Sequence, residues 1–241
     1  MKNLGKIVGH IPARAGSKRV PAKNLRLIDN APLLSYAVNA ALASCRLNEV
    51  VVNTDGLEIS KLAKSLGAKV FMRDAQYATD SASGDDFNHD FISKWYVDTL
   101  VMINPVCPLI NTSDIDAALD AYAQDDTADT LITVQSTQMQ VFFEAEPVNI
   151  TLGGHLAPTQ QNRHVDILNW AVTIWDAKAY QNRYQTGGDA YIGRQRLLFS
   201  IEPLHAIKIS TEEDFRLAEA VLKARRLACV DQAPVYWRDS Q

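Results

Sequence analysis

Near the amino terminus the sequence reads Ile7-Val8-Gly9-His10-Ile11-Pro12-Ala13-Arg14-Ala15-Gly16-Ser17-Lys18-Arg19-Val20-Pro21-Ala22-Lys23-Asn24. It starts as a short apolar strand, which ends at Pro12, and continues as a loop with one glycine, one hydroxyl and four cations. A strand that opens into a basic loop commonly holds phosphate groups, because backbone N–H groups and fixed cations converge on the anion. The alternative is a solvent-facing basic turn.

The loop matches neither of two familiar phosphate-binding fingerprints. It lacks the glycine spacing G-x-G-x-x-G of a dinucleotide site and the pattern G-x-x-x-x-G-K-[ST]. The loop by itself therefore predicts an anion site for a polyphosphate and nothing narrower.

Composition sets the broad class. The chain has 241 residues, of which 47% are hydrophobic, and a formal net charge of -4. These values are typical of a soluble globular protein, and we expect one domain over residues 1–241. No apolar run approaches the length of a membrane span, and the mild acidity argues against nucleic acid as the main partner. The three cysteines form no zinc spacing and no disulfide framework, so we expect a cytoplasmic protein.

Strand-like and helix-like runs alternate along the chain, which predicts an α/β fold with a mostly parallel, Rossmann-like sheet sandwiched by helices. After the first strand, the expected strands are Glu49–Val52, Lys69–Met72, Thr99–Ile103, Thr130–Val134 and His205–Ile209. The expected helices are Leu33–Cys45, Glu58–Leu66, Asp85–Trp95, one capped by Ser113 with Asp116, and one that Thr211 opens with Asp214. From about residue 135 to 169 the alternation stops, which predicts an extended excursion.

The run Pro12-Ala13-Arg14-x-Gly16-Ser17-Lys18-x-x-Pro21-x-Lys23-Asn24 resembles the opening signature of the acylneuraminate (CMP-sialic acid) cytidylyltransferase family. The resemblance implies the nucleotide-diphospho-sugar transferase fold. It also implies a reaction that joins a 2-keto sugar acid to CMP from CTP and releases pyrophosphate.

The same resemblance implies which residues bind CTP. The contacts carried over are Ala13, Arg14, Ser17, Lys18, Lys23 and Asn24 from the first loop. The segment from Arg73 to Ser83 resembles a second family motif, which implies that Arg73 and Ser83 contact the base and a phosphate. The resemblance assigns the acceptor to Asn104, where the family has glutamine, and to Arg163 and Asn169.

One landmark departs from the family. The family has Asp-Ile-Asp before the last helix, where the two carboxylates hold Mg²⁺, and this chain has Lys208-Ile209-Ser210. The resemblance thus implies a Mg²⁺ cofactor whose usual ligands are absent. Three interpretations follow. In the first, Lys208 supplies part of the metal's charge and is catalytic together with Arg14, Lys18 and Lys23. In the second, Lys208 binds an acidic group on an unusual acceptor, and in the third, activity is lost.

In the family the excursion is an arm that packs across a homodimer, so we expect a homodimer here. The leading prediction is a cytidylyltransferase that uses CTP and a small acidic sugar acceptor. The alternatives are a cytidylyltransferase for another acidic acceptor, such as a phosphonate or a different keto acid, and a nucleotide-binding homologue without turnover.

Overall fold

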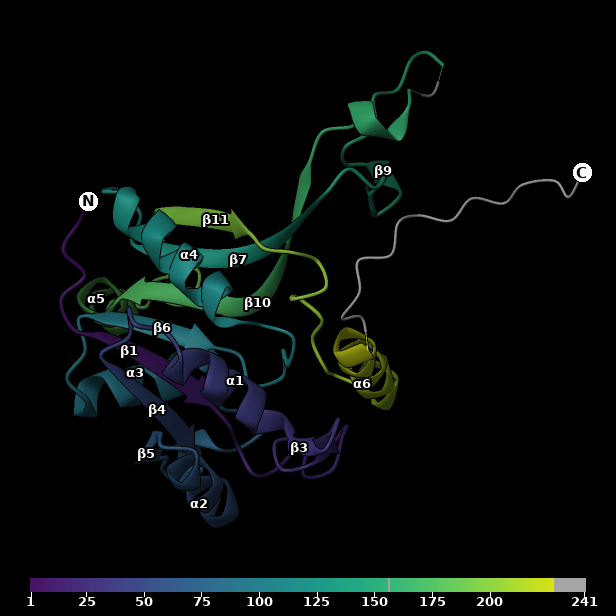
Figure 1. Cartoon of the computed structure of the whole chain (residues 1–241). Coiled ribbons are helices and arrows are strands. Elements are labelled where there is room, and N and C mark those ends of the chain that lie inside the picture. Colours follow the sequence, from purple (N-terminus) through teal and green to yellow (C-terminus); the bar gives the residue numbers. More distant parts are fainter. Residues whose placement is uncertain (156, 228–241) are drawn as a thin grey trace, which may run out of the picture.

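A seven-stranded sheet forms the centre of the protein in the computed structural model, which describes residues 1–155 and 157–227 (Figure 1). The strand order is β11-β7-β10-β6-β1-β4-β5. The strands are β1 (Ile7–Pro12), β4 (Glu49–Thr54), β5 (Lys69–Met72), β6 (Thr99–Ile103), β7 (Thr130–Thr137), β10 (Val165–Asp176) and β11 (Arg196–Ser200). Strand β10 runs antiparallel to β6 and β7, and the other neighbouring pairs are parallel. The expected mostly parallel α/β sheet is confirmed.

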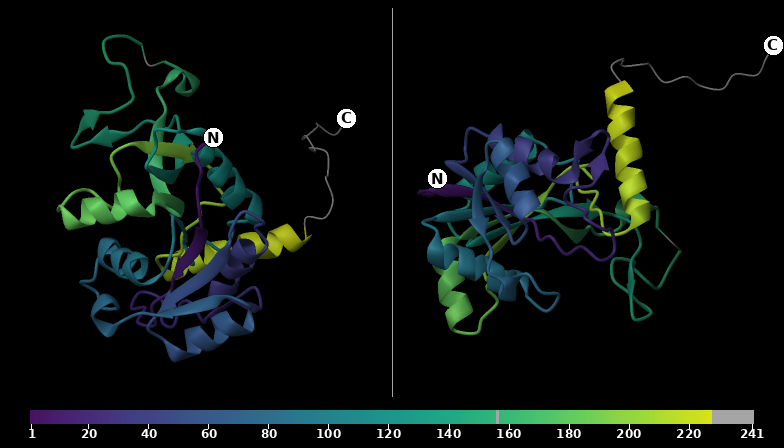
Figure 2. Two further views of the ribbon diagram at one scale, coloured as in Figure 1. Left: turned by 90° about the vertical axis from the view of Figure 1, so that its left-hand side faces the viewer. Right: turned by 90° about the horizontal axis from the view of Figure 1, so that it is seen from below.

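Helices cover both faces of this sheet (Figures 1 and 2). Three helices contribute to the larger core cluster: α1 (Leu33–Leu42), α2 (Leu57–Ser65) and α4 (Thr112–Gln124). Two helices contribute to the cluster on the other face: α3 (Gly84–Lys94) and α5 (Ala177–Gln185). Alternation along β1 decides the division, because Ile11 joins the first cluster and Val8 the second.

The last helix, α6 (Glu212–Leu227), packs on the basic loop rather than on the sheet. Phe215 and Ala218 of α6 share a small buried cluster with Val20 and Ile28, which follow or belong to that loop. Thr211 caps α6, as expected: its Oγ1 accepts from Asp214 N at 3.2 Å, and the Asp214 carboxylate accepts from Thr211 N at 2.8 Å. The apolar contacts of α6 therefore help to hold the loop in place.

Two expected local features were wrong. Segment 205–209 is not a strand, because His205 and Ala206 belong to a turn and Ile209 N donates to Val106 O, which lies in a turn and not in a strand. The strand in this region is β11, which pairs with β7. Asn111, not Ser113, caps α4, and the capping box is closed by Asp114.

The excursion forms an arm that projects from the ends of β7 and β10 (Figure 1). Between those strands lie the short pair β8 (Phe142–Phe143) and β9 (Glu146–Pro147) and the 3-10 helix η2 (Thr159–Gln161). A second small pair, β2 (Leu27–Ile28) and β3 (Ala31–Pro32), precedes α1, and the 3-10 helix η1 (Ala75–Tyr77) precedes α3. Within residues 1–155 and 157–227, no helix is both long and apolar enough to cross a membrane.

His10 lies at the centre of the sheet and is fully buried. Its Nε2 is 2.9 Å from Asn53 Nδ2, and its ring stacks on Phe91 with 4.5 Å between the ring centroids. Burial, and secondarily the positive charge of Arg73, lowers the pKa of His10 from 6.5 to about 3. The folded protein therefore keeps this imidazole neutral.

Acid is expected to destabilise the protein through His10. Between pH 6.5 and about 3 the unfolded chain takes up a proton at this residue that the folded protein does not. Stability contributed by neutral His10 is thus lost as pH falls through this window, with a limiting slope of about 1.4 kcal/mol per pH unit. In urea denaturation at neutral pH and at about pH 4.5, the variant His10→Gln should show a shallower pH dependence. Equal slopes would contradict this assignment.

Candidate functional site

The basic loop borders a cavity of about 380 Å³ at the carboxyl end of β1. Residues from three segments line it: Pro12, Arg14, Ser17, Lys18, Arg19, Lys23, Asn24, Asp80, Asn104, Pro105 and Val106. Ligands of open parallel sheets bind beyond the carboxyl ends of the strands, which is where this cavity lies. The structure thus brings together all four cations of the loop.

Backbone hydrogen bonds shape the loop. Ala15 N donates to Asp55 Oδ1 at 2.8 Å, which ties the loop to the end of β4. Asn24 Nδ2 donates to Arg14 O at 3.1 Å, which closes the loop on itself. Asn24 Oδ1 is buried and has no partner among the described residues. A buried amide oxygen without a partner is costly, so it is suited to accept a bond from a ligand hydroxyl.

Two cations of the loop converge on a single carboxylate. Arg14 Nη1 lies 2.9 Å from Asp80 Oδ1 and donates to Thr79 O at 3.2 Å, and Lys18 forms an ion pair with the other oxygen of Asp80. Hydrogen bonds from Lys18 and Arg14 lower the pKa of Asp80. The Asp80 carboxylate thus places an oxyanion between these two side chains. Phosphate oxygens are also negatively charged hydrogen-bond acceptors, so the same two side chains suit a phosphate group.

The other end of the cavity carries excess positive charge. Lys23 Nζ donates to Ile209 O at 2.9 Å. Burial, followed by the charges of Arg19, Lys208 and Arg14, lowers the pKa of Lys23. Lys208 is exposed and is not among the residues that line the cavity, but its charge acts on Lys23, which does line it. Such a cluster of cations is stabilised by a polyanion.

Three predicted CTP contacts, Ala13, Arg73 and Ser83, do not line the cavity. Arg73 is buried, and its Nε donates to Asn53 Oδ1 at 2.8 Å and its Nη2 to Asn53 O at 3.1 Å. Its guanidinium also lies 4.4 Å from the ring centroid of Phe87. Ser83 caps α3, where its Oγ donates to Asp86 Oδ2 at 2.7 Å and accepts from Asp86 N at 3.1 Å. Both side chains are therefore hydrogen-bonded within the protein. Ala13 is fully buried at the end of β1, where its N donates to Asn53 O.

The three predicted acceptor residues do not lie together. Asn104 lines the cavity, and its Nδ2 donates to Trp170 O at 3.2 Å. Asn169, one residue earlier than Trp170 on β10, accepts from Thr133 Oγ1 at 2.7 Å and from Ala171 N at 3.0 Å. Arg163 is exposed on the arm, where its carbonyl accepts from Asn149 Nδ2. Asn104 and Asn169 are thus linked through Trp170, whereas Arg163 is not among the residues of the cavity.

Sequence reasoning missed Asp55 and Asp80 as parts of the site. Both follow strands or loops that end at the carboxyl edge of the sheet, and this position was the available signal. Their partners, however, are distant along the chain: Asp55 bonds Ala15, 40 residues away, and Asp80 pairs with Arg14 and Lys18 of the first loop. Arg19 was recognised among the four cations but was given no role.

The residues at 208 and 210 do not fit a magnesium site. Mg²⁺ takes oxygen ligands, and the ammonium of Lys208 cannot ligate it. Ser210 N is engaged with Asp214 Oδ2 at 2.8 Å. Among the residues that the structure describes, no group of three or more His, Cys, Asp or Glu side chains is placed to hold a metal ion.

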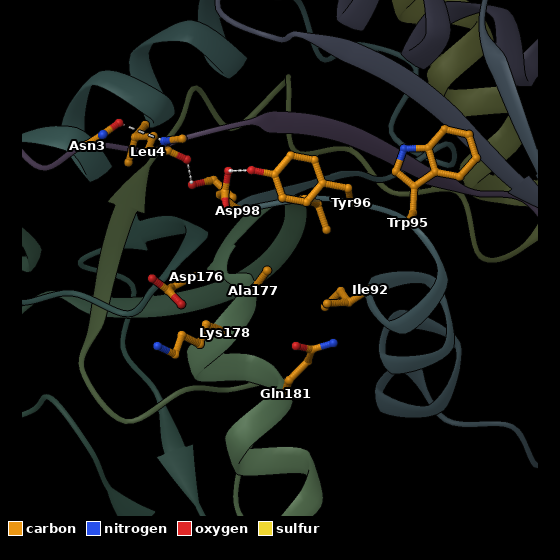
Figure 3. Close-up of a pocket in the computed structure, with 13 residues that line it drawn as sticks. Asn3, Leu4, Ile92, Trp95, Tyr96, Asp98, Asp176, Ala177, Lys178 and Gln181 are labelled. Carbon is orange, nitrogen blue, oxygen red and sulfur yellow. Dashed lines mark hydrogen bonds between the residues drawn. The ribbon is translucent and has the colours of Figure 1, made fainter.

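A second cavity of about 530 Å³ lies at the opposite edge of the sheet (Figure 3). Residues from the amino ends of β1 and β6, the end of α3 and the start of α5 line it, including Trp95, Asp98 and Gln181. Tyr96 donates to Asp98 Oδ2 at 3.2 Å at its rim. This cavity lies at the amino ends of the parallel strands and lacks a cluster of cations, so the cavity at the carboxyl edge is the candidate active site.

A mostly parallel sheet with a cationic cavity beyond its first strand is an α/β arrangement suited to nucleotide phosphates. The sequence profile of the family described as Cytidylyltransferase matches residues 8–221. The chain belongs to this family of nucleotidyltransferases, and its relatives place it with the acylneuraminate cytidylyltransferase-like members.

Two relatives and one solved structure illustrate the similarity. "Post-translational flagellin modification protein B" of Campylobacter coli is 26% identical over 95% of this chain and 100% of its own length. "N-acylneuraminate cytidylyltransferase" of Escherichia coli O18:K1:H7 is 25% identical over 94% of this chain, which spans 54% of that protein. The structure of CMP:2-keto-3-deoxy-manno-octonic acid synthetase complexed with CTP has a TM-score of 0.69 at 17% identity and covers 92% of this chain and 100% of that one. The last comparison shows a shared fold.

Proposed function

We propose that the protein transfers CMP from CTP to a sialic-acid-like 2-keto sugar acid and releases pyrophosphate. The observation that carries the proposal is the convergence of Arg14 and Lys18 on one oxyanion, beside Lys23 and Lys208. In the proposal the triphosphate takes the place of the Asp80 carboxylate between the first two cations. A cytoplasmic location belongs to the same proposal, since the substrate is a nucleoside triphosphate.

The proposed reaction is an in-line displacement. The acceptor hydroxyl oxygen forms a bond to the α-phosphorus, the bond from that phosphorus to the bridging oxygen breaks, and pyrophosphate leaves with the electron pair. The hydroxyl proton passes to solvent. The cations contribute by neutralising charge on the triphosphate, and positioning of the two reactants supplies much of the remaining rate enhancement.

The proposal gives each side of the cavity a role. Asn24 Oδ1 accepts a hydrogen bond from a ribose hydroxyl, and the hydroxyl of Ser17 donates a hydrogen bond to a phosphate oxygen. Asn104 bounds the side on which the acceptor enters. Because the residues at 208 and 210 do not fit Mg²⁺, we assign part of the charge neutralisation to Lys208, as a compact point charge.

Pyrophosphate release tests the function directly. Purified protein with CTP and several nonulosonic acids should release pyrophosphate, and the assay should be run with Mg²⁺ and with a chelator. Activity that survives chelation would agree with the role given to Lys208. Measurable CTP binding without pyrophosphate release for any acceptor would defeat the proposal.

The Lys208 position favours one second candidate, a nucleotide-binding protein without turnover. Restoring carboxylates with the double variant Lys208→Asp, Ser210→Asp should then create Mg²⁺-dependent pyrophosphate release that the native chain lacks. If the native chain already turns over, this candidate fails. A different acidic acceptor, such as a phosphonate, would instead show as turnover with that compound and silence with sialic acids.

A homodimer through the arm is part of the proposal. Phe142 and Phe143 are 59% and 69% exposed on β8, and Met139 nearby is 70% exposed. Exposed apolar side chains gathered on a projecting segment are typical of an interface. The variant Phe142→Ser, Phe143→Ser is expected to shift the protein from dimer to monomer in sedimentation velocity, with unchanged circular dichroism. A native chain that sediments as a monomer at micromolar concentration would contradict the dimer.

A further inference from the structure

Trp170 has a backbone conformation that bulky residues seldom adopt. Its φ is 59°, in the left-handed region, although it lies inside strand β10. The register between β10 and β7 shifts between Leu168 and Thr173, so Trp170 belongs to a bulge. A positive φ in a large residue is a strained outlier, and bulges next to active sites re-aim side chains.

Hydrogen bonds on both sides hold the bulge in this shape. Trp170 O accepts from Asn104 Nδ2 at 3.2 Å. Asn169 Oδ1 accepts from Ala171 N at 3.0 Å, so this bond joins the two residues that flank Trp170, and it also accepts from Thr133 Oγ1 at 2.7 Å. The Asn169 Nδ2 atom is buried and has no partner among the residues described. The bulge therefore fixes an aromatic ring and leaves an amide donor unused beside it.

The indole packs on Tyr191, which in turn lies against Gly84 at the start of α3. Its ring centroid is 5.2 Å from that of Tyr191, and the planes are inclined by 55°. Tyr191 is itself immobilised, because it packs on Trp175 and sits so close to Gly84 that a methyl group there would lie 2.5 Å from its ring. Trp170 is partly exposed, and its carbonyl contacts the cavity residue Asn104. A partly exposed aromatic ring is thus held by a bulge whose backbone is hydrogen-bonded to a residue of the cationic cavity.

We propose that Trp170 determines acceptor specificity by stacking its indole on the less polar face of the acceptor's pyranose ring, a role that rests on the proposed function. A flat, amphipathic ring with a fixed orientation binds a saturated ring at low entropic cost. The strain at Trp170 is then maintained for the position of its side chain and not for the fold.

Three variants separate the ring from the backbone. Trp170→Gly and Trp170→Ala both remove the indole, but only glycine also relieves the left-handed strain. Trp170→Phe keeps an aromatic surface. The probes are N-acetylneuraminic acid and 3-deoxy-manno-octulosonic acid, measured by calorimetric binding in the presence of CMP and by the KM for the acceptor, with CTP affinity measured in parallel.

For the acid that the native protein binds better, we expect Trp170→Gly and Trp170→Ala to weaken binding by about tenfold and Trp170→Phe by less than about threefold. CTP affinity should stay within about twofold throughout, and Trp170→Gly should melt above Trp170→Ala. Unchanged acceptor binding in Trp170→Gly, weakening in Trp170→Ala alone, or no binding of either acid to the native protein would overturn the proposal. A native chain that binds acceptor through Trp170 but releases no pyrophosphate would defeat the proposed function and leave this inference standing.

Discussion

Replacing Lys23 by methionine is expected to lower kcat/KM for CTP by about 100- to 1000-fold. Lys23 lies among Arg14, Arg19 and Lys208, so its ammonium is positioned for the triphosphate. Methionine keeps the apolar stem of the side chain and removes only the charge. Arg14→Ala should cause a loss of the same order, because it removes one of the two cations that meet at Asp80.

The matched control is Lys178→Ala, which removes an exposed lysine at the second cavity on the opposite edge of the sheet. It should leave kcat/KM and the melting temperature unchanged. Steady-state kinetics and calorimetric titration with CTP provide the measurements. If Lys23→Met and Arg14→Ala bind CTP as tightly as the native protein, the basic loop is not a nucleotide site.

The lowered pKa of Lys23 predicts how CTP binding depends on pH. Burial and neighbouring cations lower the pKa of Lys23, so affinity for CTP should decline on the alkaline side at a lower pH than for an ordinary lysine. Lys208→Ala removes one repelling charge, which should raise the pKa of Lys23 and move this decline to higher pH. A decline that stays in place in Lys208→Ala would show that the two lysines are not coupled.

Replacing Arg73 by methionine is expected to lower the free energy of unfolding by about 3 kcal/mol. The change leaves Asn53 Oδ1 without its donor in a fully buried position and removes the cation from the face of Phe87. Arg73→Lys should lose a large part of the same stability, because an ammonium cannot reproduce the fork that bonds both Asn53 oxygens. Urea denaturation measures both effects.

The Arg73 variants also decide between two roles for this residue. If the role of Arg73 is structural, CTP affinity of the folded Arg73→Lys variant falls by less than about tenfold while its free energy of unfolding drops. If Arg73 contacts the nucleoside, as the resemblance implied, affinity is lost and stability is retained. Ser83→Ala is a useful companion, since removal of this cap should cost about 1 kcal/mol with little change in CTP affinity.

Local patterns were sufficient for much of the sheet. Strands Lys69–Met72 and Thr99–Ile103 have the predicted bounds, because short apolar runs between turn signals specify a parallel strand without reference to distant residues. The basic loop was predicted for a related reason. Four cations within ten residues of one loop lie close together in any fold, because the chain itself connects them.

Tertiary structure decided the features that depend on distant partners. Segment 205–209 has a strand-like sequence but pairs with Lys23 and Val106, so no local pattern could exclude a strand. The hydrogen bonds of Arg73 to Asn53 and its contact with Phe87 could not be read from the sequence either. The meeting of Arg14 with Asp80, and of Asn104 with Trp170, likewise exists only because a folded sheet brings the ends of separate strands to one edge. The sequence by itself determines which chemical groups the chain carries and which short elements it forms. Long-range packing decides which of those groups face the cavity and which are hydrogen-bonded to other residues of the protein.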